Sequence, residues 1–216
     1  MTTSLERPHR RDHGESPRIA RTSPEMSRIR RVARAGLDLA VLWGCLLLCA
    51  PAAAGQDVTE LSLRAAFIHN FVKFTEWPRD VLPAAAPLVA CVLGDPAFGD
   101  VLENYVKGHA VDGHEIVVSR IAADGKPRSC HLLWVSGITA KQAAQVVAAL
   151  NAAPVLTLSD LDPFARIGGM AQLYVEDGRI RFRVNLDNTS RSHLQFSSRL
   201  LSLATLVKND PHAVPR

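Results

Sequence analysis

Short apolar runs that alternate with helical patterns restrict this chain to an α/β fold. The run at 88–93 is continuous, which is typical of a strand buried on both faces, and shorter strands are expected at 132–135 and 154–158. Apolar residues keep helical spacing over 97–107, and Thr139 can cap a further Ala/Gln-rich helix that ends near Leu150. Strands that alternate with helices in this way indicate a sheet covered by helical layers.

The two ends of this pattern add a covered helix and a hairpin. An opening helix from Leu61 to Trp77-Pro78 carries two apolar stripes and must be largely buried. Residues 170–175 and 179–184 flank an Asp-Gly turn, which predicts an antiparallel hairpin, and a Ser-capped helix is expected over 197–207. We therefore predict an α/β fold: a three-layer α/β/α sandwich with a mixed sheet, a C-terminal β-hairpin and a terminal helix.

The first 55 residues have the pattern of a secretory leader. Four arginines within 28–34 precede the apolar run 39–50, and Ala52 and Ala54 fit an A-x-A cleavage site. The uncharged stretch of about 17 residues is shorter than the roughly 20 that a spanning helix needs, so we expect cleavage; retention as an anchor is the alternative. Counted from Met1 the basic region is unusually long, which favours Met26 as the true start.

These features divide the chain into three parts. We predict a basic leader with a signal peptide over 1–55, one α/β domain over 56–208 and a loose tail over 209–216. The leader holds nine arginines and five acidic residues, whereas the remaining residues hold sixteen basic and sixteen acidic side chains. The net charge of +4 therefore belongs to the leader, and the neutral body does not favour a nucleic-acid-binding protein. Cleavage of the leader would leave the domain outside the cytoplasm.

Cysteine usage agrees with export. Cys45 and Cys49 lie in the leader, so Cys91 and Cys130 are the two that remain in the body. An oxidising compartment makes them a natural pair, and a bridge closing a loop of roughly 40 residues is worth about 4 kcal/mol in the chain-entropy model. Two free buried thiols are the alternative. Neither C-x-x-C nor H-E-x-x-H occurs, so we expect no metal and no cofactor.

Acidic residues at strand ends are the feature closest to an enzyme site. Asp95 follows one apolar run, and Asp160 and Asp162 follow another, at the sheet edge where α/β proteins bind ligands. Each of them also has a structural explanation as a turn or helix-cap residue. No nucleophile elbow, P-loop or dinucleotide fingerprint occurs, and we expect no catalytic activity.

Two glycine loops form a candidate ligand site. Gly94 with Asp95, and Gly168 with Gly169, lie beside strands where the backbone can approach a small molecule closely. One pocket that joins both loops would support this hypothesis, and a position at opposite edges of the sheet would remove it.

Several blocks, taken in order, resemble the YfiR-type periplasmic family, and the likeness runs from about residue 60 to 207. The blocks are L-R-A-A-F-I-H-N-F-V-K-F-T-E-W-P at 63–78, G-D-P-A-F-G at 94–99, C-H-L-L-W-V-S at 130–136, P-V-L-T at 154–157, R-F-R-V-N at 181–185 and L-x-F-S-S-x-L-L-x-L-A at 194–204. The family's named member represses the inner-membrane diguanylate cyclase YfiN and is itself sequestered by the outer-membrane lipoprotein YfiB. The resemblance implies an α/β/α sandwich, a homodimer and control of a membrane signalling protein.

The resemblance also bears on the cysteines. Cys91 and Cys130 match a disulfide position of the family, whereas a second, short-range bridge has no counterpart because no cysteine follows Cys130. Redox control through that second bridge is therefore not expected here.

We expect a periplasmic regulator that represses an inner-membrane diguanylate cyclase by direct contact and so controls cyclic-di-GMP. The candidate contact residues are Arg181, Arg183 and Asn185 on the last strand. The simpler explanations are a solvated strand face for the two arginines and a local backbone cap for Asn185. The alternative function is a periplasmic small-ligand sensor that serves a histidine kinase.

Overall fold

A computed structural model describes residues 54–122, 125 and 127–213 of the chain. The predicted signal peptide, its cleavage site and the start at Met26 fall on or next to residues outside this part. Within the described residues, no helix is both long enough and apolar enough to cross a bilayer.

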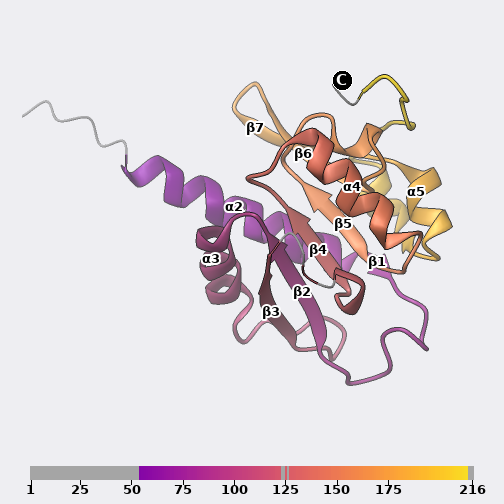
Figure 1. The fold of residues 1–216 in the computed structure, drawn as a ribbon. Coiled ribbons are helices and arrows are strands. Elements are labelled where there is room, and N and C mark those ends of the chain that lie inside the picture. The colour runs from indigo at the N-terminus through magenta and orange to yellow at the C-terminus, as the bar shows by residue number, and fades with distance from the viewer. Residues whose placement is uncertain (1–53, 123–124, 126, 214–216) are drawn as a thin grey trace, which may run out of the picture. The chain divides into compact units, whose positions relative to one another are not determined.

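A seven-stranded mixed sheet forms the centre of the domain (Figure 1). Its strand order is β3-β2-β4-β5-β6-β7-β9. The first five strands in this order run parallel to one another, β7 is antiparallel to β6, and β9 is parallel to β7. The strands are β2 (Leu88–Leu93), β3 (Ile116–Ile121), β4 (Leu132–Val135), β5 (Leu156–Ser159), β6 (Ala171–Glu176), β7 (Arg179–Val184) and β9 (Thr205–Leu206).

Helices cover both faces of the sheet, which confirms the predicted three layers. On one face α2 (Ala54–Lys73) and α3 (Pro96–Val106) pack over a core that contains Trp134. On the other, α4 (Ala140–Leu150) and the 3-10 helix η2 (Phe164–Arg166) cover a separate core that contains Leu133. Because neighbouring strand residues point to opposite faces, β2 and β4 must be apolar at every position. A second 3-10 helix, η1 (Pro127–Ser129), precedes β4.

The chain end is built differently from the prediction. The expected helix over 197–207 is a single turn, α6 (Ser198–Leu201), and Thr205–Leu206 then pair with Arg183 and Val184 of β7. Without β9, backbone N–H and C=O groups at the open edge of β7 would be unpaired. Pairing with this distant strand therefore outweighs the local helical pattern. The opening helix likewise ends at Lys73, before a short strand β1 (Thr75–Glu76) that pairs with β8 (Gln195–Phe196).

The first residues of the predicted loose tail are anchored. The Asn209 side-chain oxygen accepts hydrogen bonds from Asn185 and Asn188, each 3.0 Å long, and the Asp210 N–H donates to the Arg166 carbonyl at 2.9 Å. The predicted loose tail therefore cannot begin as early as Asn209.

Candidate functional site

A disulfide joins Cys91 of β2 to Cys130, which lies just before β4. Cys91 and Cys130 lie 39 residues apart in sequence, their Cα atoms are 5.9 Å apart, and both side chains are buried. The predicted pair is thus the one that the structure contains, and it ties neighbouring strands together within the core under α4.

The arginines of β7 occupy the exposed face of the hairpin, as alternation predicts. The Arg181 guanidinium lies 3.2 Å from a Glu176 carboxylate oxygen. The Arg183 guanidinium lies over the Tyr174 ring, 3.9 Å from its centroid, and 3.7 Å from Asp162. Their charges are therefore partly satisfied within the domain, although both side chains remain accessible to a partner.

Asn185 does not share this exposed face with the arginines, and the prediction that it contacts a partner is wrong. The residue is fully buried. Its side-chain oxygen accepts from the Asn188 N–H at 3.2 Å and so caps α5 (Leu186–Arg191), and its amide nitrogen donates to the Ala165 carbonyl at 2.8 Å. A buried side chain with these partners positions the backbone and cannot reach another protein.

The carboxyl ends of β2 and β4 lie at the switch point where open α/β sheets commonly bind ligands. Here the loops after the two strands pack closely on each other, because a Cβ atom on Gly94 would overlap the Ser136 carbonyl oxygen. Asp95 next to it accepts from the Phe98 N–H at 3.0 Å and caps α3. Both residues thus have structural tasks at this edge.

The two aspartates after β5 are also engaged separately. Asp160 forms an ion pair with Arg64 of α2, which also contacts Glu60 at 2.7 Å. Burial raises the pKa of the Asp160 carboxyl above its ordinary value, although the Arg64 guanidinium opposes that rise. Asp162 accepts from the Gln172 amide at 2.9 Å and does not cap the short helix η2, contrary to the prediction. Within the described residues, no three potential metal ligands cluster.

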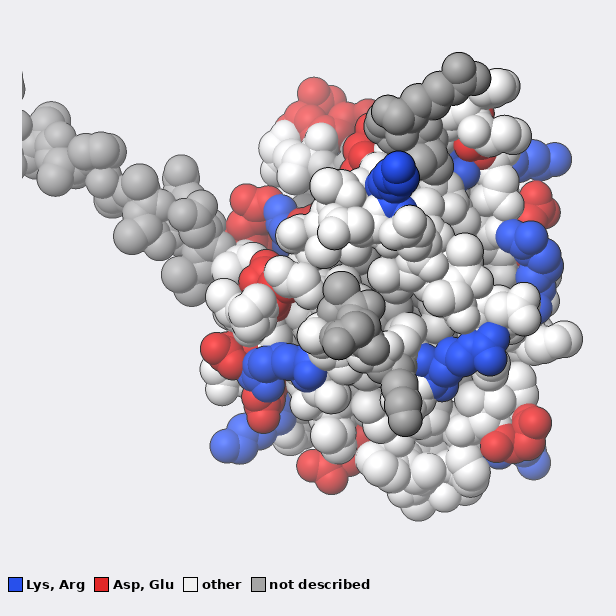
Figure 2. Space-filling model, viewed as in Figure 1, with Lys and Arg blue, Asp and Glu red and all other residues white. Residues whose placement is uncertain are grey.

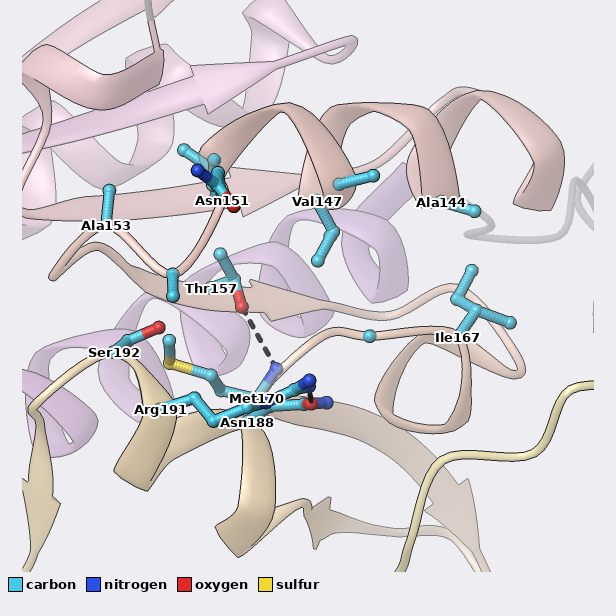
Figure 3. Close-up of a pocket in the computed structure, with 14 residues that line it drawn as sticks. Ala144, Val147, Asn151, Ala153, Thr157, Ile167, Met170, Asn188, Arg191 and Ser192 are labelled. Atoms are coloured by element: carbon cyan, nitrogen blue, oxygen red, sulfur yellow. Dashed lines mark hydrogen bonds between the residues drawn. The ribbon is translucent and has the colours of Figure 1, made fainter.

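A cavity of about 340 Å³ lies between α4 and α5 (Figure 3). Val147 and Asn151 come from α4 and its end, whereas Asn188 and Arg191 come from α5, on the opposite wall. Thr157 lies between the two walls and accepts a 3.0 Å hydrogen bond from the Met170 N–H. The described lining residues are Ala144, Val147, Ala148, Leu150, Asn151, Ala152, Ala153, Thr157, Ile167, Gly168, Met170, Asn188, Arg191 and Ser192.

The hypothesis that the two glycine loops form one ligand site is wrong. Gly168 lines the cavity between α4 and α5, whereas Gly94 lines a different one near Arg120, at the opposite end of the parallel strands. Gly169 has a packing role, because a Cβ atom there would overlap the Phe164 ring. The two loops therefore cannot hold one ligand.

Sequence reasoning missed the α5 side of this cavity. Asn188, Arg191 and Ser192 follow the i, i+3, i+4 spacing that places residues on one helix face, but the segment reads as a polar turn. An Asn185 N-cap three residues before Asn188 is the signal that could have revealed the helix.

An apolar groove of about 190 Å³ forms a second candidate surface, on the α2 side of the sheet. Phe67 of α2 and Phe74, which directly follows α2, lie on one side of it, and Leu200 of α6 and Leu203 lie on the other. Leu203 is 71% exposed, and Leu206 of β9 is 57% exposed. Large exposed apolar side chains of this kind are typical of protein contact surfaces.

Known proteins are similar to this chain in sequence pattern and in structure. Residues 61–205 match a family model described as YfiR/HmsC-like. A crystal structure of a conserved domain protein from Vibrio cholerae O1 biovar El Tor N16961 is similar, with a TM-score of 0.47 and 11% sequence identity. That similarity covers 69% of this chain and 60% of the Vibrio chain.

Proposed function

This chain belongs to the YfiR/HmsC-like family, and on that basis we propose that it is a periplasmic regulator of an inner-membrane diguanylate cyclase. The observation that carries the proposal is the family match over 61–205, which spans nearly the whole described domain. Repression by direct contact would control the production of cyclic-di-GMP. It requires that the regulator bind the inactive state of the cyclase more tightly than the active state.

The periplasmic location is supported by two independent features of the chain. The leader has the pattern of a cleaved signal peptide. The buried disulfide between Cys91 and Cys130 is of a kind that persists in oxidising compartments and is rare in the cytosol.

Action by contact rather than by catalysis is supported by the tasks of the acidic residues. Asp95 caps a helix, Asp160 pairs with Arg64, and Asp162 binds Gln172. A general acid and base need a shared position for a substrate, and these three carboxylates are each committed to a different protein group.

For the contact surface we propose the apolar groove around Leu203, together with Arg181 and Arg183 as a secondary site. Leu203 and Leu206 present the largest exposed apolar side chains near the chain end, and burial of such side chains drives association. We also propose a homodimer and sequestration by an outer-membrane lipoprotein, both by family likeness. Light scattering on the purified domain tests the dimer.

A deletion strain tests the function. Loss of the gene should raise cyclic-di-GMP and surface attachment, and the wild-type chain should restore both. Leu203→Glu should fail to restore them because a carboxylate cannot be buried in an apolar contact without a partner. Val175→Glu is the matched control: Val175 is 59% exposed on β6 and does not line the groove, and this variant should complement fully. Unchanged nucleotide levels in the deletion strain would rule out the proposed function.

The second candidate function is a small-ligand sensor that serves a histidine kinase, and the cavity beside α5 favours it. It predicts a response that depends on a ligand, whereas constitutive repression predicts the same rise in cyclic-di-GMP whether or not the ligand is present.

A further inference from the structure

We propose that the cavity between α4 and α5 binds a small organic carboxylate, with its charge on Arg191 and its apolar part against Val147, Ile167 and Met170. This inference concerns the domain itself and holds whichever membrane protein the chain regulates.

The size and lining of the cavity suit a small amphipathic molecule. Its volume of about 340 Å³ lies at the lower end of the range for small-molecule sites, roughly 300–1,000 Å³. Val147 from α4 faces Met170 across the space in Figure 3, and Ile167 closes one end. Polar and apolar surface line the cavity in comparable amounts: Asn188, Arg191 and Ser192 supply polar groups on the α5 side, whereas Val147 and Ile167 supply apolar surface.

The charge on the lining residues selects an anion. Arg191 is the one charged side chain among the described residues that line the cavity. It donates to the Asn188 side-chain oxygen, and no carboxylate of the described part lies within ion-pair distance of it. A guanidinium carries five N–H donors, so it retains donors that a carboxylate can accept in a bidentate pair.

Arg191 is an exposed residue, but the acceptor on which its guanidinium rests is held in place before any ligand arrives. Asn188 is nearly fully buried, and its amide nitrogen donates to the Gly169 carbonyl at 2.9 Å and to the Asn209 side-chain oxygen at 3.0 Å. The Asn209 amide nitrogen in turn donates at 3.0 Å to the Asn188 side-chain oxygen. The same oxygen accepts from the Arg191 guanidinium. This network fixes the acceptor on which the guanidinium rests, which reduces the entropy lost when a ligand binds.

A carboxylate fits this arrangement better than a phosphate. A phosphate group carries more charge and is usually held by several cations or by a set of backbone N–H groups. The cavity offers a single guanidinium with uncharged polar and apolar walls, which match one negative charge on a small, partly apolar body.

Amide-resolved NMR titration of the mature chain tests the proposal, with acetate, isovalerate and benzoate as probes. Isovalerate and benzoate should shift the Gly168 and Met170 amides saturably and bind more tightly than acetate. The uncharged analogue benzamide and inorganic phosphate should both bind more weakly than benzoate.

Two variants locate the site. Arg191→Gln should weaken benzoate binding by about tenfold or more, as expected for a lost charge-assisted hydrogen bond. Arg179→Gln removes an exposed arginine on β7 that does not line the cavity, and it should bind benzoate as the wild type does. Ala148→Phe fills the cavity from the exposed side of α4 and should abolish binding while thermal unfolding stays near that of the wild type.

Three results would overturn the inference. In the first, none of the three carboxylates binds saturably. In the second, benzamide or phosphate binds as tightly as benzoate. In the third, Ala148→Phe binds benzoate with unchanged affinity. If Arg191→Gln does not fold, Ala148→Phe and benzamide still decide the question. A regulator that represses the cyclase yet binds none of these carboxylates would contradict this inference and leave the proposed function standing.

Discussion

Gly94 has two separate reasons to lack a side chain. Its φ of +89° lies in the left-handed region that favours glycine, and a Cβ atom would overlap the Ser136 carbonyl oxygen. The loop after β2 therefore rests directly on the backbone of the loop after β4. Gly94 therefore has a packing role at the switch point of the sheet.

Replacing Gly94 by alanine should lower the free energy of unfolding by about 3 kcal/mol, because backbone strain and a steric clash add together. Urea denaturation of the purified domain measures the loss. Gly113 is the matched control, since its φ is +87° but no atom lies within 4 Å of the place that a Cβ atom would take there. Gly113→Ala should cost only about 1 kcal/mol, from strain alone. Equal losses in the two variants would show that the Ser136 contact is unimportant.

At the scale of elements, the contact between α2 and α3 contains a cluster of aromatic rings. His69 of α2 lies 6.0 Å from the Tyr105 ring of α3 and 6.0 Å from the His109 ring that follows it. The buried His69 Nε2 atom has no hydrogen-bond partner within the described residues. Burial lowers the pKa of the His69 imidazole, and the neighbouring His109 and Lys73 lower it further. The folded domain therefore favours the neutral ring.

Acid should weaken this helix contact. Because the unfolded chain binds the His69 proton more readily than the folded one, stability should be constant above the ordinary histidine pKa of about 6.5 and fall as the pH drops below it. Thermal unfolding measured from neutral to mildly acidic pH checks this.

His69→Phe removes the titrating group but keeps an apolar ring, so the fall in stability over that pH range should become smaller. His212→Asn, at an exposed position near the chain end, should leave it unchanged. A wild-type slope that persists in His69→Phe would assign the effect to another group.

Elements whose signal is local were predicted well. Three elements have their predicted positions: the strand at 88–93, the strand at 132–135 and the helix capped by Thr139. Apolar runs and a capping box depend only on residues that are close in sequence. The terminal helix was wrong beyond Leu201, because pairing with β7, more than ten residues earlier in the chain, decides its conformation.

At the scale of the molecule, charges of both signs are interspersed. On the face that Figure 2 shows, basic and acidic side chains lie mainly around the periphery, and uncharged residues occupy much of the middle. This distribution agrees with the balanced charge of the body after residue 55 and provides no single-signed stripe on that face for nucleic acid.

Reduction should destabilise the whole domain. The bridge between Cys91 and Cys130 closes a 39-residue separation, for which the chain-entropy model expects about 4 kcal/mol. Urea midpoints measured with and without reductant should differ by a corresponding amount. In the Cys91→Ala, Cys130→Ala double variant, reductant should have no effect, which separates the bridge from other reducible groups. A wild-type midpoint that reductant does not change would show that the bridge contributes little.

The amino-acid sequence by itself determined the class of the fold, most strand positions, the cysteine pair and the family likeness, because apolar periodicity and short motifs involve neighbouring residues. Only the tertiary structure decided that Asn185 is buried, that Asn188, Arg191 and Asn209 meet beside a cavity, and that the two glycine loops lie at opposite ends of the strands. These outcomes depend on strand order and on contacts between distant segments. No local pattern encodes them, because the energy that stabilises each contact arises only when the whole sheet is assembled.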